Sequence, residues 1–135
     1  MPDCIFCKIV RGEIPSFKVY EDDSALAFLD INPVHPGHTL VIPKEHAGNI
    51  FEISADSWSH VQEIVRKVAV AIEDATHADG VNVLMNNREH AGQIVGHAHV
   101  HLIPRFKGDG LNKWPHKPLD MSEGPVLAEK IKAAL

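Results

Sequence analysis

The sequence lacks both a long apolar run and an excess of basic residues. No apolar stretch approaches the roughly 20 residues that span a bilayer, and the start, MPDCIFCKIV, lacks the features of a secretory signal. The net charge of -5, from 13 Lys and Arg against 18 Asp and Glu, is the opposite of the basic balance of a protein that coats nucleic acid. We therefore expect a cytoplasmic protein that binds neither a membrane nor nucleic acid.

Cysteine is also scarce, since Cys4 and Cys7 are the only two. In a reducing compartment both are thiols, and their C-x-x-C spacing predicts a metal clip instead of a disulfide. Tetrahedral zinc needs two further ligands, and His46 and His97 are the best candidates. Two alternatives stay open. One is two reduced thiols without metal, and the other is a redox pair, which is disfavoured because no strand precedes it in a βαβ unit.

With 135 residues, 44% hydrophobic and 23% charged, the chain predicts a single globular domain over residues 1–135 with a real core. One or two helical turns are expected over residues 4–14. Alternating or β-branched patterns predict strands over residues 17–22, 25–30, 38–43, 81–87 and 97–104. A short helix over residues 126–134 closes the chain. The order predicts an α+β fold with a largely antiparallel sheet and one long helix.

The long helix is predicted from an apolar stripe at a 3-4-3-4-3 spacing. The stripe consists of Trp58, Val61, Val65, Val68, Ile72 and Ala75. Ser54 is a plausible amino-terminal cap, and Asp79 with Gly80 a plausible stop. The helix would therefore run for about twenty residues.

Three histidines alternate in the stretch GHAHVHLIPR, at positions 97, 99 and 101. On a strand they share one face while the apolar residues between them face the core. A generic solvated strand would sooner use Thr, Lys or Glu. Two functions fit the triplet, namely ligation of a metal that activates water and an imidazole nucleophile that is oriented by its neighbours.

The context of the triplet resembles a known family. NNREHAGQIVGHAHVHLIPR is similar to the signature of the histidine triad (HIT) family, in which three alternating histidines follow an Ala-Gly-Gln loop. The stretch from Cys4 to His46 resembles the family's amino-terminal half. The resemblance implies a HIT-like fold whose sheet continues across a homodimer. It also implies a Hint-like hydrolase or transferase that acts at the α-phosphorus of a purine nucleotide.

By this resemblance four histidines form the catalytic group. His99 is the nucleophile, forming a nucleotidyl-imidazole that water hydrolyses, and a neutral imidazole is competent for this near pH 7. His101 contacts the phosphate or leaving group and assists proton transfer. His38 supports the triplet. His97 belongs to the group through its ring, which a structural zinc on Cys4, Cys7, His46 and His97 would fix beside the nucleophile.

The resemblance also implies a nucleotide site. Asp30 matches an acidic residue that grips the ribose hydroxyls. Apolar residues around it match the walls of a purine slot, namely Ile5, Phe6, Ile9, Phe28, Leu29 and Ile31. The phosphate contacts would come from Asn86 and from the loop residues Gly92, Gln93, Ile94 and Val95. Ile94 stands where many members have a serine whose hydroxyl contacts the phosphate, and Trp114 resembles a tryptophan that reaches the partner's active site.

Several functions share these residues. The first is hydrolysis of a nucleoside phosphoramidate or adenylated amine to AMP. A diadenosine polyphosphate hydrolase or a nucleotidyl transferase would use the same nucleophile. A regulatory protein that binds nucleotide, with incidental turnover, is the alternative from another class.

Overall fold

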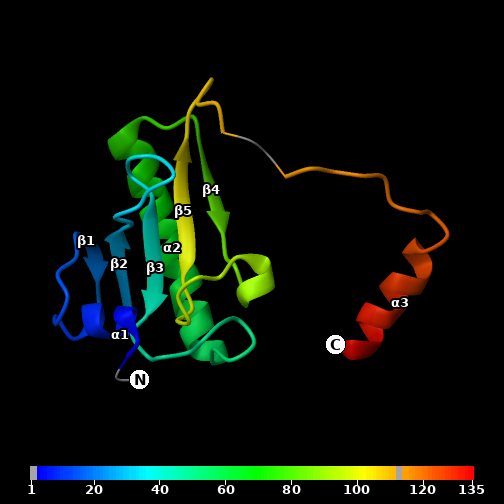
Figure 1. Ribbon diagram of the computed structural model, residues 1–135, viewed down its shortest axis with the longest axis horizontal. Helices are drawn as coiled ribbons and strands as arrows, with labels where there is room; N and C mark the ends of the chain where they lie inside the picture. Colours follow the sequence, from blue (N-terminus) through cyan, green and yellow to red (C-terminus); the bar gives the residue numbers. More distant parts are fainter. Residues whose placement is uncertain (1–2, 112–113) are drawn as a thin grey trace.

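The computed structural model of the protein describes residues 3–111 and 114–135. The strands are β1 Lys18–Glu21, β2 Ala25–Leu29, β3 Thr39–Pro43, β4 Gly80–Leu84 and β5 Val100–Arg105, and the helices are α1 Ile5–Val10, α2 Ala55–Thr76 and α3 Gly124–Ala134, with a short 3-10 turn, η1, over Glu89–Ala91. The strands form one antiparallel sheet in the order β1-β2-β3-β5-β4 (Figure 1). The predicted α+β class is confirmed.

The sheet is covered on both faces, by α2 on one and by α1 on the other (Figure 1). Alternation along β2 separates the two sets, because Ala25 and Ala27 pack against α2 while Leu26 and Phe28 pack against Phe6 of α1. The central strands β2 and β3 are therefore almost continuously apolar and buried. The α1 face is the one that carries the histidines, as the ring contact of Phe6 with His99 shows.

The long helix starts where the sequence predicts and ends earlier. Ser54 caps it, its hydroxyl oxygen accepting a hydrogen bond from the Ser57 N–H at 3.2 Å. The predicted stop at Asp79 and Gly80 is wrong, since the helix ends at Thr76 and His77 adopts a left-handed conformation with φ 56°. The reason is that the chain must already join the sheet at Asp79, whose N–H donates to the Arg105 carbonyl.

The strand that carries the histidines is shorter than predicted. The alternating pattern suggested a strand from residue 97, but β5 begins at Val100. The Ala98 N–H donates to the carbonyl of Ala47 in the loop after β3, so this part of the chain is tied to a loop instead of to a strand. His97 and His99 consequently lie just before the strand, and only His101 lies within it.

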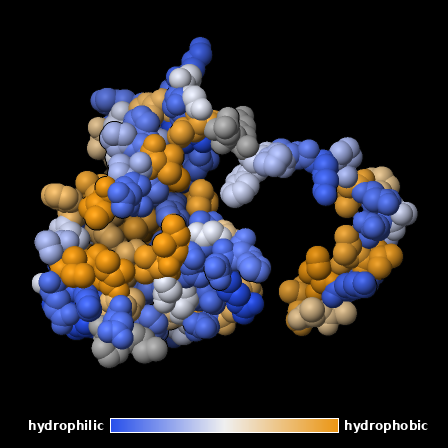
Figure 2. All heavy atoms as spheres, in the orientation of Figure 1, coloured by the Kyte–Doolittle hydropathy of each residue, from blue (hydrophilic) through white to orange (hydrophobic). Residues whose placement is uncertain are grey.

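The carboxyl-terminal helix stands apart from the sheet (Figure 1). It spans Gly124–Ala134, close to the predicted residues 126–134, and none of its residues is buried. Its apolar side chains Leu127 and Ile131 are exposed, and Figure 2 shows apolar side chains along this helix. Among the helices of the described residues, none is both long enough and apolar enough to cross a membrane.

Candidate active site

A backbone carbonyl fixes the protonation of the His99 ring. His99 Nδ1 lies 2.6 Å from the carbonyl oxygen of His97, and a carbonyl can only accept, so Nδ1 carries the proton. Nε2 is therefore left with its lone pair. Burial lowers the pKa of His99, so the ring is neutral near pH 7. The chain thus presents a buried imidazole whose free nitrogen is nucleophilic.

A second backbone group orients His38 and, through it, His101. The Val34 N–H donates to His38 Nδ1 at 3.1 Å, so a neutral His38 carries its proton on Nε2. That Nε2–H donates to His101 Nδ1 at 2.9 Å. His101 in turn keeps its proton on Nε2. Burial lowers the pKa of both rings, and with His99 and His38 nearby the pKa of His101 falls to about 4.

The atoms of Asp30, His38 and His101 also lie within 4.8 Å of one another. A metal would need a lone pair from each of them. The Nε2 of His38 is a hydrogen-bond donor here, because Nδ1 is occupied by the Val34 N–H. We therefore interpret this cluster as a hydrogen-bonded relay instead of a metal site.

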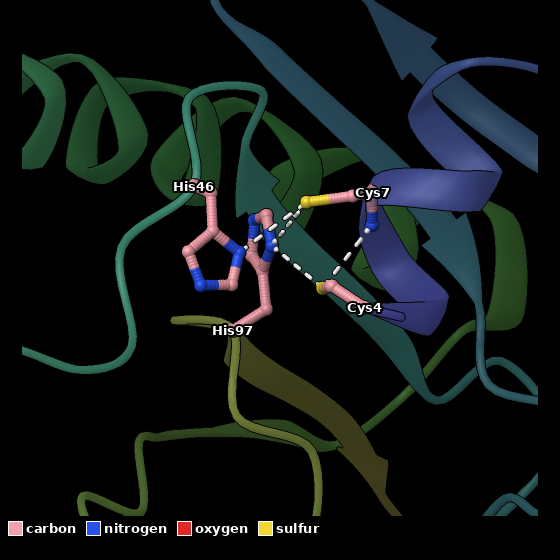
Figure 3. A group of neighbouring side chains, drawn as sticks. All are labelled: Cys4, Cys7, His46 and His97. Carbon is pink, nitrogen blue, oxygen red and sulfur yellow. Dashed lines mark hydrogen bonds between the residues drawn. The ribbon is translucent and has the colours of Figure 1, made fainter. Parts of the chain in front are cut away.

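The two cysteines meet two histidines beside α1 (Figure 3). His97 is fully buried, and its Nε2–H donates to the Pro43 carbonyl at 2.8 Å, which leaves Nδ1 free to face the sulfurs. That Nδ1 lies 3.4 Å from Cys4 Sγ and 3.6 Å from Cys7 Sγ. His46 Nδ1 lies 3.3 Å from Cys7 Sγ. Four soft or borderline donor atoms therefore converge on one point.

The spacing of these donors fits a tetrahedral zinc ion. With Zn–S near 2.3 Å and Zn–N near 2.0 Å, neighbouring S and N ligands of a tetrahedral ion stand about 3.5 Å apart. The three S···N distances of 3.3 to 3.6 Å agree with that edge. Cys4 also accepts a hydrogen bond from the Cys7 N–H at 3.3 Å, which fixes the first turn of α1 in the required shape.

Beside the histidines lies a cavity of about 360 Å³ between α1 and the sheet. Twelve of the fourteen predicted nucleotide-site residues line it, namely Ile5, Phe6, Ile9, Phe28, Leu29, Asp30, Ile31, Gly92, Ile94, Val95, His99 and His101. Ile94 is 95% exposed at its edge. The Asp30 carboxylate accepts from the Asn32 N–H at 2.8 Å and retains further acceptor capacity.

The two remaining predicted residues do not line this cavity. Gln93 Oε1 accepts from the Arg88 N–H, and its Nε2 donates to the carbonyls of Gly48 and Val95 at 2.6 and 3.0 Å. Its amide therefore ties two loops together, and a phosphate contact would require these bonds to be exchanged. Asn86 packs against Gly92, whose φ of +94° favours glycine.

Three features of the site lie outside the sequence-based prediction. The carbonyls of Pro43 and His97, which set the two tautomers, carry no side-chain signature. Ser16 lines the same cavity between α1 and β1, and an isolated serine in a polar stretch gives no signal. Trp114 is 76% exposed and lies away from this cavity, in a separate hollow that Val83 and Leu111 also line. Its contact with a partner's site stays a prediction.

Comparisons with known proteins give a consistent result. The model of the HIT domain family matches residues 11–108. Among curated proteins, "Protein hit" of Bacillus subtilis is 54% identical over 109 residues, covering 80% of this chain and 75% of the relative. "Adenosine 5'-monophosphoramidase hnt1" of Schizosaccharomyces pombe is 44% identical over 134 residues, covering 98% of each chain.

Solved structures are also similar to this chain. A crystal structure from Streptococcus mutans UA159 has a TM-score of 0.94 and 49% identity, covering 99% of this chain and 86% of that one. A histidine triad family protein from Mycobacterium smegmatis, described as Zn-bound, has a TM-score of 0.79 and 34% identity, covering 99% of both chains. These structures support the HIT fold.

Proposed function

This chain belongs to the HIT family, and on that basis we propose that it hydrolyses purine nucleotides at the α-phosphorus, releasing AMP. The observation that carries the proposal is the tautomer of His99, whose Nδ1–H is bonded to the His97 carbonyl. This bond leaves Nε2 free in a residue that lines the cavity. The name of the fission-yeast relative, an adenosine 5'-monophosphoramidase, supports the same reaction class.

In the first step, His99 Nε2 donates its lone pair to the α-phosphorus, and the bond from phosphorus to the leaving amine breaks. The amine departs with the electron pair and takes up a proton from solvent. The neutral His101 ring donates a hydrogen bond to it through Nε2–H and keeps its own proton. The ring of His99 becomes positively charged. The His97 carbonyl, 2.6 Å from Nδ1, stabilises that charge.

In the second step, water attacks the same phosphorus and loses one proton to solvent. The bond to His99 breaks with its electron pair returning to Nε2, giving AMP and the neutral ring. Each of the two displacements has a lower barrier than a single direct attack of water on the substrate. Asp30, which lines the cavity beside the histidines, is proposed to accept hydrogen bonds from the ribose hydroxyls.

We also propose a structural zinc ion on Cys4, Cys7, His46 and His97. The matching S···N distances and the Pro43 carbonyl that directs His97 Nδ1 toward the sulfurs support this assignment. When bound, the ion would tie α1 and the loop after β3 to the residue that precedes the nucleophile. The predicted cytoplasmic location, a reducing compartment, keeps both cysteines available as ligands.

The predicted homodimer remains part of the proposal. An 11-residue helix without a buried residue is marginal in water, and the apolar side chains of α3 are exposed in a single chain. We expect light scattering to give twice the 14.9 kDa of one chain. A mass of one chain at all concentrations would contradict the dimer.

A substrate panel tests the proposed reaction. We expect the protein to turn over adenosine 5'-phosphoramidate and adenylated lysine with a higher kcat/KM than diadenosine polyphosphate. AMP release is the measurement, followed by chromatography. Preference for the polyphosphate would favour the alternative hydrolase. Binding of AMP without turnover of any of the three would favour a regulatory protein.

A further inference from the structure

Ser16, a residue of the wall of the nucleotide cavity, carries an unpaired hydroxyl. Its Oγ is buried and is the single buried side-chain N or O atom without a hydrogen-bond partner among residues 3–111 and 114–135. The residue lines the same cavity as Asp30 and His99. Leaving a buried hydroxyl unpaired costs about 1 to 3 kcal/mol. Because Ser16 lines the cavity, rotation about χ1 turns the hydroxyl from its buried position toward it, and a ligand that offers a partner atom there recovers that cost.

The sheet places Ser16 at a defined end of the cavity. The Leu29 N–H donates to the Phe17 carbonyl, and Lys18 pairs with Phe28. In an antiparallel pair, the residue two positions before Lys18 lies opposite the residue two positions after Phe28. Ser16 therefore lies beside Asp30 on the same face of the sheet. Because β1 lies on the far side of β2 from β3 and β5, Ser16 is farther from the histidines than Asp30 is.

The polar groups of the cavity therefore run in one order across the sheet, from His101 on β5, through Asp30 after β2, to Ser16 before β1. Neighbouring strands are about 4.8 Å apart, and β5 is separated from β1 by three such spacings, through β3 and β2. The distance from His101 to Ser16 is therefore about 14 Å. A nucleoside monophosphate has its phosphate, ribose and base in the same order. The remaining wall near Ser16 is apolar and includes Ile9 and Ile14, as suits a purine ring.

We propose that the Ser16 hydroxyl hydrogen-bonds to the edge of the purine base and makes Ser16 a base-recognition residue. The inference rests on the proposed nucleotide function. A hydroxyl is one donor and two acceptors, so it pairs with a ring nitrogen or an exocyclic group of the base. A site that pairs in this way discriminates against ligands that lack the partner atom.

The test compares AMP binding to the wild type and to Ser16→Ala by isothermal titration calorimetry. We expect about tenfold weaker binding of AMP by the variant. Ribose 5-phosphate, which has no base, should bind both proteins equally in an NMR titration. Ser24→Ala, in the exposed turn between β1 and β2, is the matched control and should bind AMP as the wild type does.

The outcomes separate the two proposals. A wild type that does not bind AMP overturns the nucleotide function and the role of Ser16 together. A wild type and a Ser16→Ala variant with equal affinity for AMP overturn the role of Ser16 alone, as does an equal loss for ribose 5-phosphate. The Tm of ligand-free Ser16→Ala should not fall below that of the wild type, because the hydroxyl has no partner in the free protein.

Discussion

Replacing His99 with alanine is expected to lower kcat/KM for adenosine phosphoramidates by on the order of a thousandfold or more, while AMP binding changes only a few-fold. The loss is large because, among the described residues that line the cavity, no other offers the same free nitrogen. His101 accepts through Nδ1 from His38, and His97 turns Nδ1 toward the cysteines. Steady-state AMP release measures the rate, and calorimetry measures the binding.

The same variant tests the covalent intermediate. Wild-type protein, quenched in the presence of substrate, should show a species heavier by one adenylyl group in mass spectrometry, and His99→Ala should not. His116→Ala, which alters an exposed histidine of the carboxyl-terminal segment, is the matched control and should keep the wild-type rate. A His99→Ala protein with the wild-type rate on every substrate would show that another group attacks phosphorus.

The fold was predictable because its elements depend on local patterns. The stripe of α2 and the apolar strands β2 and β3 follow directly from the spacing of their side chains. The wrong predictions concern the ends of helices and strands, because backbone groups that are distant in the sequence determine where these elements end. Asp79 joins the sheet through Arg105, and Ala98 is held by Ala47, so neither the end of α2 nor the start of β5 could be inferred from its own neighbourhood.

The sequence predicted which residues lie close together, but not which nitrogen of each histidine ring carries a proton. Regular spacing and family resemblance single out His97, His99 and His101, and the structure gathers them with the predicted cysteines and Asp30. The tautomer of each ring depends on two main-chain carbonyls and one main-chain N–H. Such groups occur at almost every residue, so the sequence does not single them out. The fold, and not the spacing of the histidines, therefore determines which nitrogen carries a proton.

Chelation of the proposed zinc ion, or loss of one of its proposed ligands, is expected to produce the largest change in stability. A ligand present at a thousand times its Kd stabilises a protein by about 4 kcal/mol, and at this chain length each kcal/mol moves Tm by about 4 °C. Chelation, Cys7→Ser or His46→Ala should therefore lower Tm by about 15 °C. Calorimetry gives Tm, and elemental analysis should find one zinc per wild-type chain.

The expected loss follows from what the four ligands connect. Cys4 and Cys7 belong to the first turn of α1, His46 to the loop after β3, and His97 to the segment before β5. Without the ion, this six-residue helix would be held only by the packing of Phe6, Cys7, Ile9 and Val10. His90→Ala, an exposed loop histidine, should retain zinc and the wild-type Tm. A folded, metal-free wild type whose Tm does not respond to zinc or chelator would contradict the assignment and favour the two reduced thiols.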